Sequence, residues 1–105
     1  ALGDIGHHFP DTSDEFAGID SKILLSRTME LVREAGFALG NADITIALQA
    51  PKIGAYVPQM RSTLAQVMGV SDDQVSVKAT TEEGLGFTGA GEGIAAHAVG
   101  LLEEK

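Results

Sequence analysis

The chain has 105 residues, of which 44% are hydrophobic and 21% are charged, as is usual for one globular domain. Fifteen acidic against seven basic residues give a formal net charge of −8, the wrong sign for attraction to nucleic acid, so we expect no nucleic-acid partner. The absence of cysteine excludes disulfides, thiol redox chemistry and zinc fingers. No apolar run approaches the roughly 20 residues that a bilayer span needs, so we expect a soluble protein with no membrane partner.

Residues 1–19 predict a loop, because Gly, Asp, Pro and Ser interrupt any periodic pattern. A loop of this length in a small domain is usually functional. A helix is predicted next, over residues 21–35: Asp20 or Ser21 can cap its start, and Gly36 favours a left-handed end. The apolar face expected for it carries Leu24, Thr28, Leu31, Val32 and Ala35.

After Phe37 the hydrophobic period changes to two and predicts a strand that Pro51 ends. The buried face of that strand would carry Ala42, Ile44, Ile46 and Leu48. A second helix follows, ended by Gly69, with helical spacing at Val57, Met60, Leu64 and Val67. Alternation in "DDQVSVKATT" predicts a second strand, and alternation over residues 94–100 favours a third. The order α, β, α, β, β predicts an α+β fold in which a mixed sheet packs against helices.

The stretch "GLGFTG" at residues 84–89 has the G-x-G-x-x-G spacing of dinucleotide-binding loops. That fingerprint requires a following helix and a second parallel strand, and we expect neither in the residues up to Lys105. We therefore expect these glycines to serve a close approach of the backbone to a ligand, a neighbouring subunit or a tight turn.

Four blocks in order, "DIGHHFPDTSD", "NADITIALQAPKI", "SVKATTEEGLGFTG" and "GEGIAAHAV", resemble the 2-C-methyl-D-erythritol 2,4-cyclodiphosphate synthase family of non-mevalonate isoprenoid biosynthesis. The resemblance runs over residues 1–105 and implies one domain of that kind. It also implies a homotrimer with active sites at subunit interfaces. The family's zinc ligands lie in a segment that precedes this stretch, so no residue here is assigned to zinc.

The reaction implied by the resemblance is intramolecular: the 2-phosphate of 4-diphosphocytidyl-2-C-methyl-D-erythritol 2-phosphate displaces CMP from the diphosphate. The expected partner is therefore a cytidine diphosphate-type small molecule, and the expected cofactors are divalent metals, Zn²⁺ with Mg²⁺ or Mn²⁺. Because the substrate carries its own nucleophile, the protein needs to orient the substrate and neutralise charge. The resemblance implies a phosphorus-oxygen lyase, cytoplasmic in bacteria or plastidic in a plant or alga.

In the family's "TxE" block, the resemblance places catalytic roles on Thr81 and Glu83. Glu83 would coordinate magnesium at the diphosphate, and Thr81 with Thr80 would donate hydrogen bonds to phosphate oxygens. Taken alone, "TTEE" is typical of a solvated strand end.

The remaining substrate-binding positions that the resemblance implies fall in three segments. The block "ALQAPKI" would read the cytosine edge and a nearby phosphate, and "DIG" would bind the ribose. The loop over the methylerythritol phosphate and Phe87 complete the set. In full, these residues are Asp4, Gly6, Phe9, Pro10, Asp11, Leu48, Ala50, Pro51, Lys52, Ile53 and Phe87.

Several further positions carry other expectations. Ser13 and Ala90 stand where the family usually has an acid and an arginine, and Ala90 cannot supply the charge that would hold an isoprenoid diphosphate. His7 and His8 lack a spacing that favours metal ligation. His97 has apolar neighbours and predicts a core or interface position. A non-catalytic nucleotide-binding module or an inactive fragment stays open as an alternative to the enzyme.

Overall fold

The computed structural model describes residues 2–10 and 18–105, so Asp11 and Ser13 lie outside the described residues. This part of the chain contains four helices and three strands, with single 3-10 turns at Gly54–Tyr56 and Asp72–Gln74. In order they are α1 Ile5–His8, α2 Ser21–Glu34, β1 Phe37–Ala47, α3 Val57–Met68, β2 Val75–Thr80, α4 Gly86–Gly89 and β3 Ala95–Glu104.

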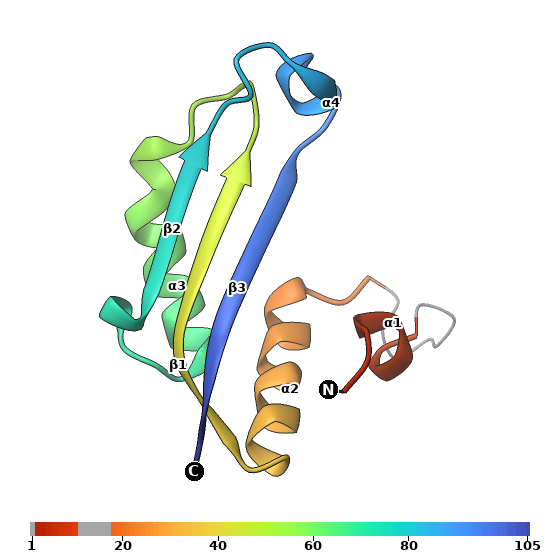
Figure 1. The fold of residues 1–105 in the computed structure, drawn as a ribbon, viewed down its shortest axis with the longest axis vertical. Helices are drawn as coiled ribbons and strands as arrows, with labels where there is room; N and C mark the ends of the chain where they lie inside the picture. Colours follow the sequence, from red (N-terminus) through yellow and green to blue (C-terminus); the bar gives the residue numbers. More distant parts are fainter. Residues whose placement is uncertain (1, 11–17) are drawn as a thin grey trace.

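The three strands form one sheet in the order β2-β1-β3, and Figure 1 shows them side by side. β1 pairs with β2 in parallel and with β3 antiparallel, which confirms the predicted mixed sheet and the predicted α+β class. Because β3 follows the glycine segment and runs antiparallel to β1, the described residues contain no dinucleotide-binding βαβ unit at that segment.

The two long helices begin and end where the sequence predicts. The Asp20 carboxylate accepts a hydrogen bond from the Lys22 N–H at 2.8 Å and so caps α2. Gly69 ends α3 with a φ of 72°, a left-handed conformation that glycine adopts without steric cost. Ala35, predicted as the last helical residue, is the C-cap of α2.

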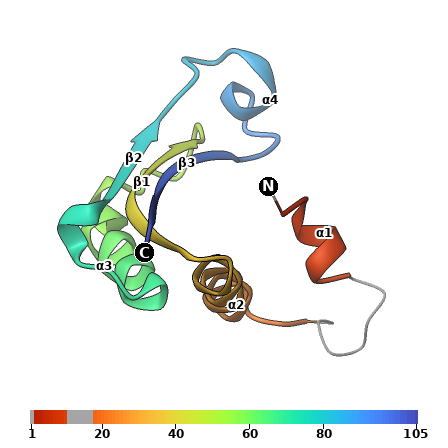
Figure 2. The ribbon, with the colours of Figure 1, turned by 60° about the horizontal axis from the view of Figure 1, so that its bottom comes forward.

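The core lies between the sheet and the two helices α2 and α3, which run side by side along one face of the sheet (Figure 2). Its buried residues come from both helices and from β2: Met29, Ala65, Met68, Val75 and Val77. Each buried Val or Met side chain contributes roughly 1.5–3 kcal/mol relative to an exposed one. This core is what holds β1 and β2 in register.

The predicted inner face of α2 was rotated from the observed one. Met29 is the buried residue of α2, and Leu25 packs against the same core. The predicted Thr28 and Leu31 instead line a hollow shared with α1. The helix has apolar contacts on two sides, and periodicity alone did not show which side faces the sheet.

Three further expectations are corrected by the structure. The predicted loop over residues 1–19 includes a helical turn in its described part, α1, capped by Asp4. The glycine segment also contains a single turn, α4. His97 is exposed on β3, so its prediction as a core residue was wrong for the chain by itself, and the interface alternative stays a prediction.

The sheet face opposite α2 and α3 carries no helix along it in the described ranges. We call this the open face. It is formed by alternate residues of all three strands: Ser76 and Lys78 of β2, Asn41, Asp43 and Thr45 of β1, and His97, Val99 and Leu101 of β3. Val99 is 73% exposed and Leu101 is 57% exposed.

Candidate functional site at the carboxyl ends of the parallel strands

The parallel strands β1 and β2 end at the same edge of the sheet, near α4 (Figure 1). Their last residues, Ala47 and Thr80, are paired in register. Just beyond them the Leu48 N–H donates to the Thr80 carbonyl oxygen at 3.0 Å. This hydrogen bond keeps the two outgoing segments together, so residues that follow both strands share one site. Ligands commonly bind at the carboxyl ends of parallel strands.

A pocket of about 230 Å³ lies at this edge, and we call it the rim pocket. Its walls are largely apolar, with Lys52 supplying a cation and two threonines supplying hydroxyls. Its lining is Leu48, Gln49, Pro51, Lys52, Ile53, Gly54, Ala79, Thr80 and Thr81. The structure therefore brings together most of the predicted cytidine-binding residues with the two threonines predicted to contact phosphate.

Local sequence explains the shape of the rim pocket. Proline cannot continue the ladder, and the chain turns at Pro51, whose peptide bond to Ala50 is cis. The 3-10 turn at Gly54–Tyr56 leads into α3, and Pro58 occupies the first turn of that helix, where its missing N–H has no cost. The predicted Ala50 lies within this turn but outside the pocket lining.

Gln49 and Gly54 line the rim pocket although the sequence did not predict them. Both flank the predicted Pro51 turn, so the turn itself was the available signal. Gln49 offers an amide that can both donate and accept hydrogen bonds. Gly54 presents bare backbone to the pocket.

Glu83 sits in a tight turn immediately after Thr81. Its φ is 52°, the one positive φ of a non-glycine residue in the described part of the chain, and Gly84 follows with a φ of 83°. The Leu85 N–H donates to the Glu82 carbonyl oxygen at 3.0 Å, and positive φ at both central residues is typical of a type I′ turn. A left-handed conformation costs an L-residue roughly 1–2 kcal/mol, and such strain clusters at functional positions.

Thr81 connects this turn to the rim pocket. Its Oγ1 accepts a hydrogen bond from the Glu83 N–H at 3.3 Å, so the threonine hydroxyl and the Glu83 backbone are neighbours. Glu83 itself is exposed and forms no ion pair in the described structure. The carboxylate is therefore free to meet a ligand from solvent.

The residues here fit magnesium but not zinc. No cluster of three or more His, Cys, Asp or Glu side chains gathers within the described ranges. Zinc sites take three or four protein ligands, whereas magnesium is usually held by one or two carboxylates together with substrate phosphates and water. Glu83 beside a threonine hydroxyl suits the second arrangement.

The predicted residues of the N-terminal loop lie elsewhere in the chain. Asp4 Oδ1 accepts a hydrogen bond from the His7 N–H at 2.9 Å and caps α1, which contains Gly6. Asp4 and Phe9 line a hollow of about 210 Å³ against α2. Pro10 is exposed. Figure 1 shows α1 beside α2, away from the edge where β1 and β2 end, so one chain does not bring these residues to the rim pocket.

Phe87 lies on α4, at the same end of the sheet as the rim pocket (Figure 1). It is 55% exposed, and its ring packs over Gly93. A large exposed aromatic ring at a site edge can cover a bound ligand, because it offers a wide apolar surface.

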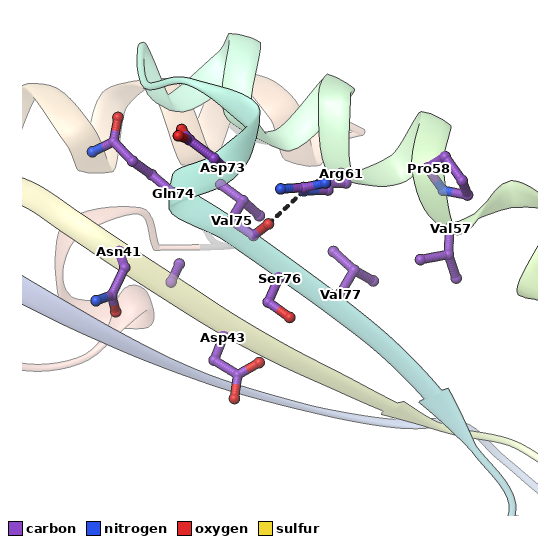
Figure 3. Close-up of a pocket in the computed structure, with 11 residues that line it drawn as sticks. Asn41, Asp43, Val57, Pro58, Arg61, Asp73, Gln74, Val75, Ser76 and Val77 are labelled. Atoms are coloured by element: carbon purple, nitrogen blue, oxygen red, sulfur yellow. Dashed lines mark hydrogen bonds between the residues drawn. The ribbon is translucent and has the colours of Figure 1, made fainter.

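A second hollow, of about 490 Å³, runs along the free edge of β2 and contains none of the predicted site residues (Figure 3). Its polar groups already serve the fold. Arg61 Nε donates to the carbonyl oxygens of Asp72 and Val75, both at 2.7 Å. Gln74 Nε2 donates to the carbonyl oxygens of Leu39 and Gly40 at 3.2 and 3.0 Å. We therefore place the candidate site at the rim pocket.

Two curated bacterial relatives are similar to this chain. The 2-C-methyl-D-erythritol 2,4-cyclodiphosphate synthase of Ectopseudomonas mendocina is 59% identical over 97% of this chain and 65% of its own length. The protein of the same name from Parabacteroides distasonis is 56% identical over 97% of this chain and 63% of its own length. The chain thus spans slightly less than two thirds of these relatives.

Solved structures agree with this similarity. The bifunctional IspDF from Campylobacter jejuni superposes with a TM-score of 0.93 at 39% identity, covering 99% of this chain and 28% of that one. A Plasmodium falciparum IspF in complex with CDP gives a TM-score of 0.83 at 31% identity over 98% of this chain and 61% of its own. A CDP-bound 2C-methyl-D-erythritol-2,4-cyclodiphosphate synthase gives 0.88 at 34% identity, over 97% and 65%.

No helix within the described residues has the length and the apolar composition of a membrane span.

A family model described as the YgbB family matches residues 1–103, nearly the whole of the sequence. The match includes every segment that forms the rim pocket and the Glu83 turn. The chain therefore belongs to the YgbB family.

Proposed function

We propose that the protein carrying this chain is a 2-C-methyl-D-erythritol 2,4-cyclodiphosphate synthase of non-mevalonate isoprenoid biosynthesis. The observation that carries the proposal is the rim pocket, where the Pro51 turn, Thr80 and Thr81 meet at one edge of the sheet beside the Glu83 turn. The names of the curated relatives support the activity. Two of the similar structures are complexes with CDP, which supports a cytidine diphosphate-type ligand.

In the proposed reaction an oxygen of the 2-phosphate attacks the β-phosphorus of 4-diphosphocytidyl-2-C-methyl-D-erythritol 2-phosphate. A new P–O bond closes the cyclic diphosphate as the bond from the β-phosphorus to the bridging oxygen breaks, and CMP leaves with that oxygen. Both reacting groups belong to one substrate, so this is a phosphorus-oxygen lyase reaction. Holding the substrate bent for in-line attack can contribute on the order of 7–11 kcal/mol.

Residues of the chain would bind the base, the phosphates and the metal ion. Backbone groups along Leu48–Ile53 would bind the base, and Lys52 would approach a phosphate. The hydroxyls of Thr80 and Thr81 would donate hydrogen bonds to phosphate oxygens. Glu83 would hold Mg²⁺ or Mn²⁺, which when bound neutralises the charge that develops on the phosphoryl oxygens. Zinc would be held outside these residues.

We further propose a homotrimer in which the loop that carries Asp4, Phe9 and Asp11 completes the rim pocket of a neighbouring subunit. The distance of α1 from the rim in Figure 1 supports this arrangement, because Asp4 and Phe9 need a second chain to reach the pocket. The exposed apolar residues of the open face, including Val99 and Leu101, supply a surface that favours association. One domain over residues 1–105 and action in the cytoplasm of a bacterium belong to the same proposal.

Phosphorus NMR tests the activity directly. The longest natural polypeptide that contains this chain is incubated with the substrate, zinc and magnesium, and CMP and the cyclic diphosphate should appear together at equal rates. A chelator should stop both. CDP should bind more tightly than UDP, because in this proposal the backbone groups of the Pro51 turn read the hydrogen-bonding edge that distinguishes cytosine from uracil. If a folded, metal-loaded protein releases no CMP, the proposed synthase activity is refuted.

A further inference from the structure

The glycine segment contains a contact that the proposed chemistry does not use. Gly89 is buried, and its Cα faces the backbone of Gly84. A Cβ on Gly89 would overlap the carbonyl carbon of Gly84 and would lie 2.8 Å from its Cα and 3.0 Å from its N. These are backbone atoms of a turn, which cannot move aside as the end of a side chain can. Only glycine fits at position 89.

Gly84 is the second central residue of the turn that carries Glu83. The turn is held on its first side by the Thr81 hydroxyl, which accepts from the Glu83 N–H. On its other side, the Gly89 N–H donates to the Leu85 carbonyl oxygen at 3.1 Å. α4 therefore both hydrogen-bonds to the end of the turn and presses against its middle.

The other glycines of the segment do not share this contact. Gly84, Gly86 and Gly91 have positive φ values, but an added Cβ at any of them would meet nothing within 4 Å. At Gly93 a Cβ would come within 3.0 Å of the Phe87 ring, which is a movable side chain. Gly89 is thus distinguished by backbone-to-backbone packing and not by a need for positive φ.

We propose that Gly89 is a positioning residue for the Glu83 carboxylate. By letting α4 rest directly on Gly84, it holds the left-handed Glu83 in the orientation in which the carboxylate meets the divalent ion. The inference rests on the proposed function in its assignment of Glu83 to a metal. Residues that orient a metal ligand typically change metal affinity by about 10–100-fold when they are replaced.

The test is Gly89→Ala in the longest natural polypeptide that contains this chain, with rates of CMP release measured against Mn²⁺ concentration. The half-saturating Mn²⁺ concentration should rise about tenfold, while the dissociation constant for CDP in chelator stays unchanged. Gly69→Ala is the matched control: it forces alanine into a left-handed C-cap remote from the site, lowers the melting temperature and leaves the Mn²⁺ dependence as it was.

A double-mutant cycle with Glu83→Gln separates positioning from a general structural role. If Gly89 acts through Glu83, adding Gly89→Ala to Glu83→Gln should not lower the rate further. Equal rate losses in both backgrounds would overturn the inference. So would an unchanged Mn²⁺ dependence in folded Gly89→Ala protein.

Hydrogen exchange of the Leu85 amide tests the same idea without turnover. This amide closes the Glu83 turn, so it should exchange about tenfold faster in Gly89→Ala and at the wild-type rate in Gly69→Ala. Absence of CMP release by the wild type would refute the proposed function, whereas unchanged Leu85 exchange would refute the positioning role. If Gly89→Ala does not fold, the Leu85 and Gly89 amides of the wild type are compared instead. A turn held in place by α4 should open together with α4, so the two amides should exchange with similar protection, and a Leu85 amide that exchanges fast while Gly89 stays protected would overturn the inference.

Discussion

The helix-covered face of the sheet and the rim where β1 and β2 end are built on the same strands but by different means. On the covered face, Val75 and Val77 are buried against α3, and none of the core residues has a positive φ. At the rim, Glu83 and Phe87 are exposed, and the backbone turns left-handed twice in succession. Burial of apolar side chains stabilises the covered face. Part of that stabilisation offsets the cost of the strained, solvent-facing backbone at the rim.

We expect the largest effect from Glu83→Gln, which should lower activity at the rim and leave the stability of the covered face unchanged. The change removes the carboxylate charge at the rim without touching the core, so kcat should fall roughly 10²–10³-fold while the melting temperature stays near the wild-type value. CMP release and a thermal melt on the same sample measure both. Glu82→Gln, one residue earlier and also exposed, is the control. Equal losses in the two variants would refute the proposed metal role of Glu83.

A charge introduced on the open face should weaken association of subunits without preventing folding. Leu101→Lys places a cation where no part of the described chain covers the strand, so the subunit should fold normally but associate roughly 30-fold or more weakly. Analytical ultracentrifugation over a concentration series gives the change in the association constant. Gln66→Lys adds the same charge on an exposed position of α3 and should leave association intact. Unchanged assembly in Leu101→Lys would exclude the open face as the interface.

Overpacking should affect only the covered face. Ala65 is fully buried between α3 and the strands, and Ala65→Leu should lower the free energy of unfolding by about 1–3 kcal/mol. Urea denaturation measures this change. Gln66→Leu introduces the same side chain on the neighbouring exposed position and should change stability by less than about 0.5 kcal/mol. A neutral Ala65→Leu would mean that the core contains space that the structure does not show.

The smallest expected effect is a gain in stability at the rim. Glu83→Gly relieves the left-handed strain and should raise the free energy of unfolding by about 1 kcal/mol while CMP release is lost. Urea denaturation beside the activity assay shows the two opposite changes. Glu82→Gly, at a residue without positive φ, should instead be neutral or destabilising. If Glu83→Gly lowers the free energy of unfolding, the Glu83 side chain stabilises the turn, and the idea that it is kept there at a cost in stability is wrong.

Much of the fold was predictable because its signals are local. The Asp20 cap and the left-handed Gly69 set the ends of the two long helices, and the period of two marked β1, β2 and β3. Capping and periodicity act over a few residues, so they are written directly in the sequence. The resemblance to the synthase family, carried by four ordered blocks, was equally visible and is confirmed by the family match over residues 1–103.

The single turns α1 and α4 were not predicted, because a four-residue helix has no period to detect. The buried side of α2 was also predicted wrongly, since its apolar residues serve two contacts and only the packed structure separates Met29 from Leu31. His97 was expected in a core or at an interface from its apolar neighbours, but those neighbours are themselves exposed on β3, so the core alternative was wrong and the interface alternative stays a prediction.

By itself, the sequence determined the order of the two long helices and the three strands, the mixed character of the sheet and the segments that carry the candidate chemistry. Only the tertiary structure decided that the Pro51 turn and Thr81 form one pocket, that Glu83 occupies a left-handed turn, and that Gly89 rests on Gly84. The physical reason is distance along the chain. Contacts between residues far apart depend on how whole elements pack, and packing is a property of the folded molecule that no short stretch of sequence contains.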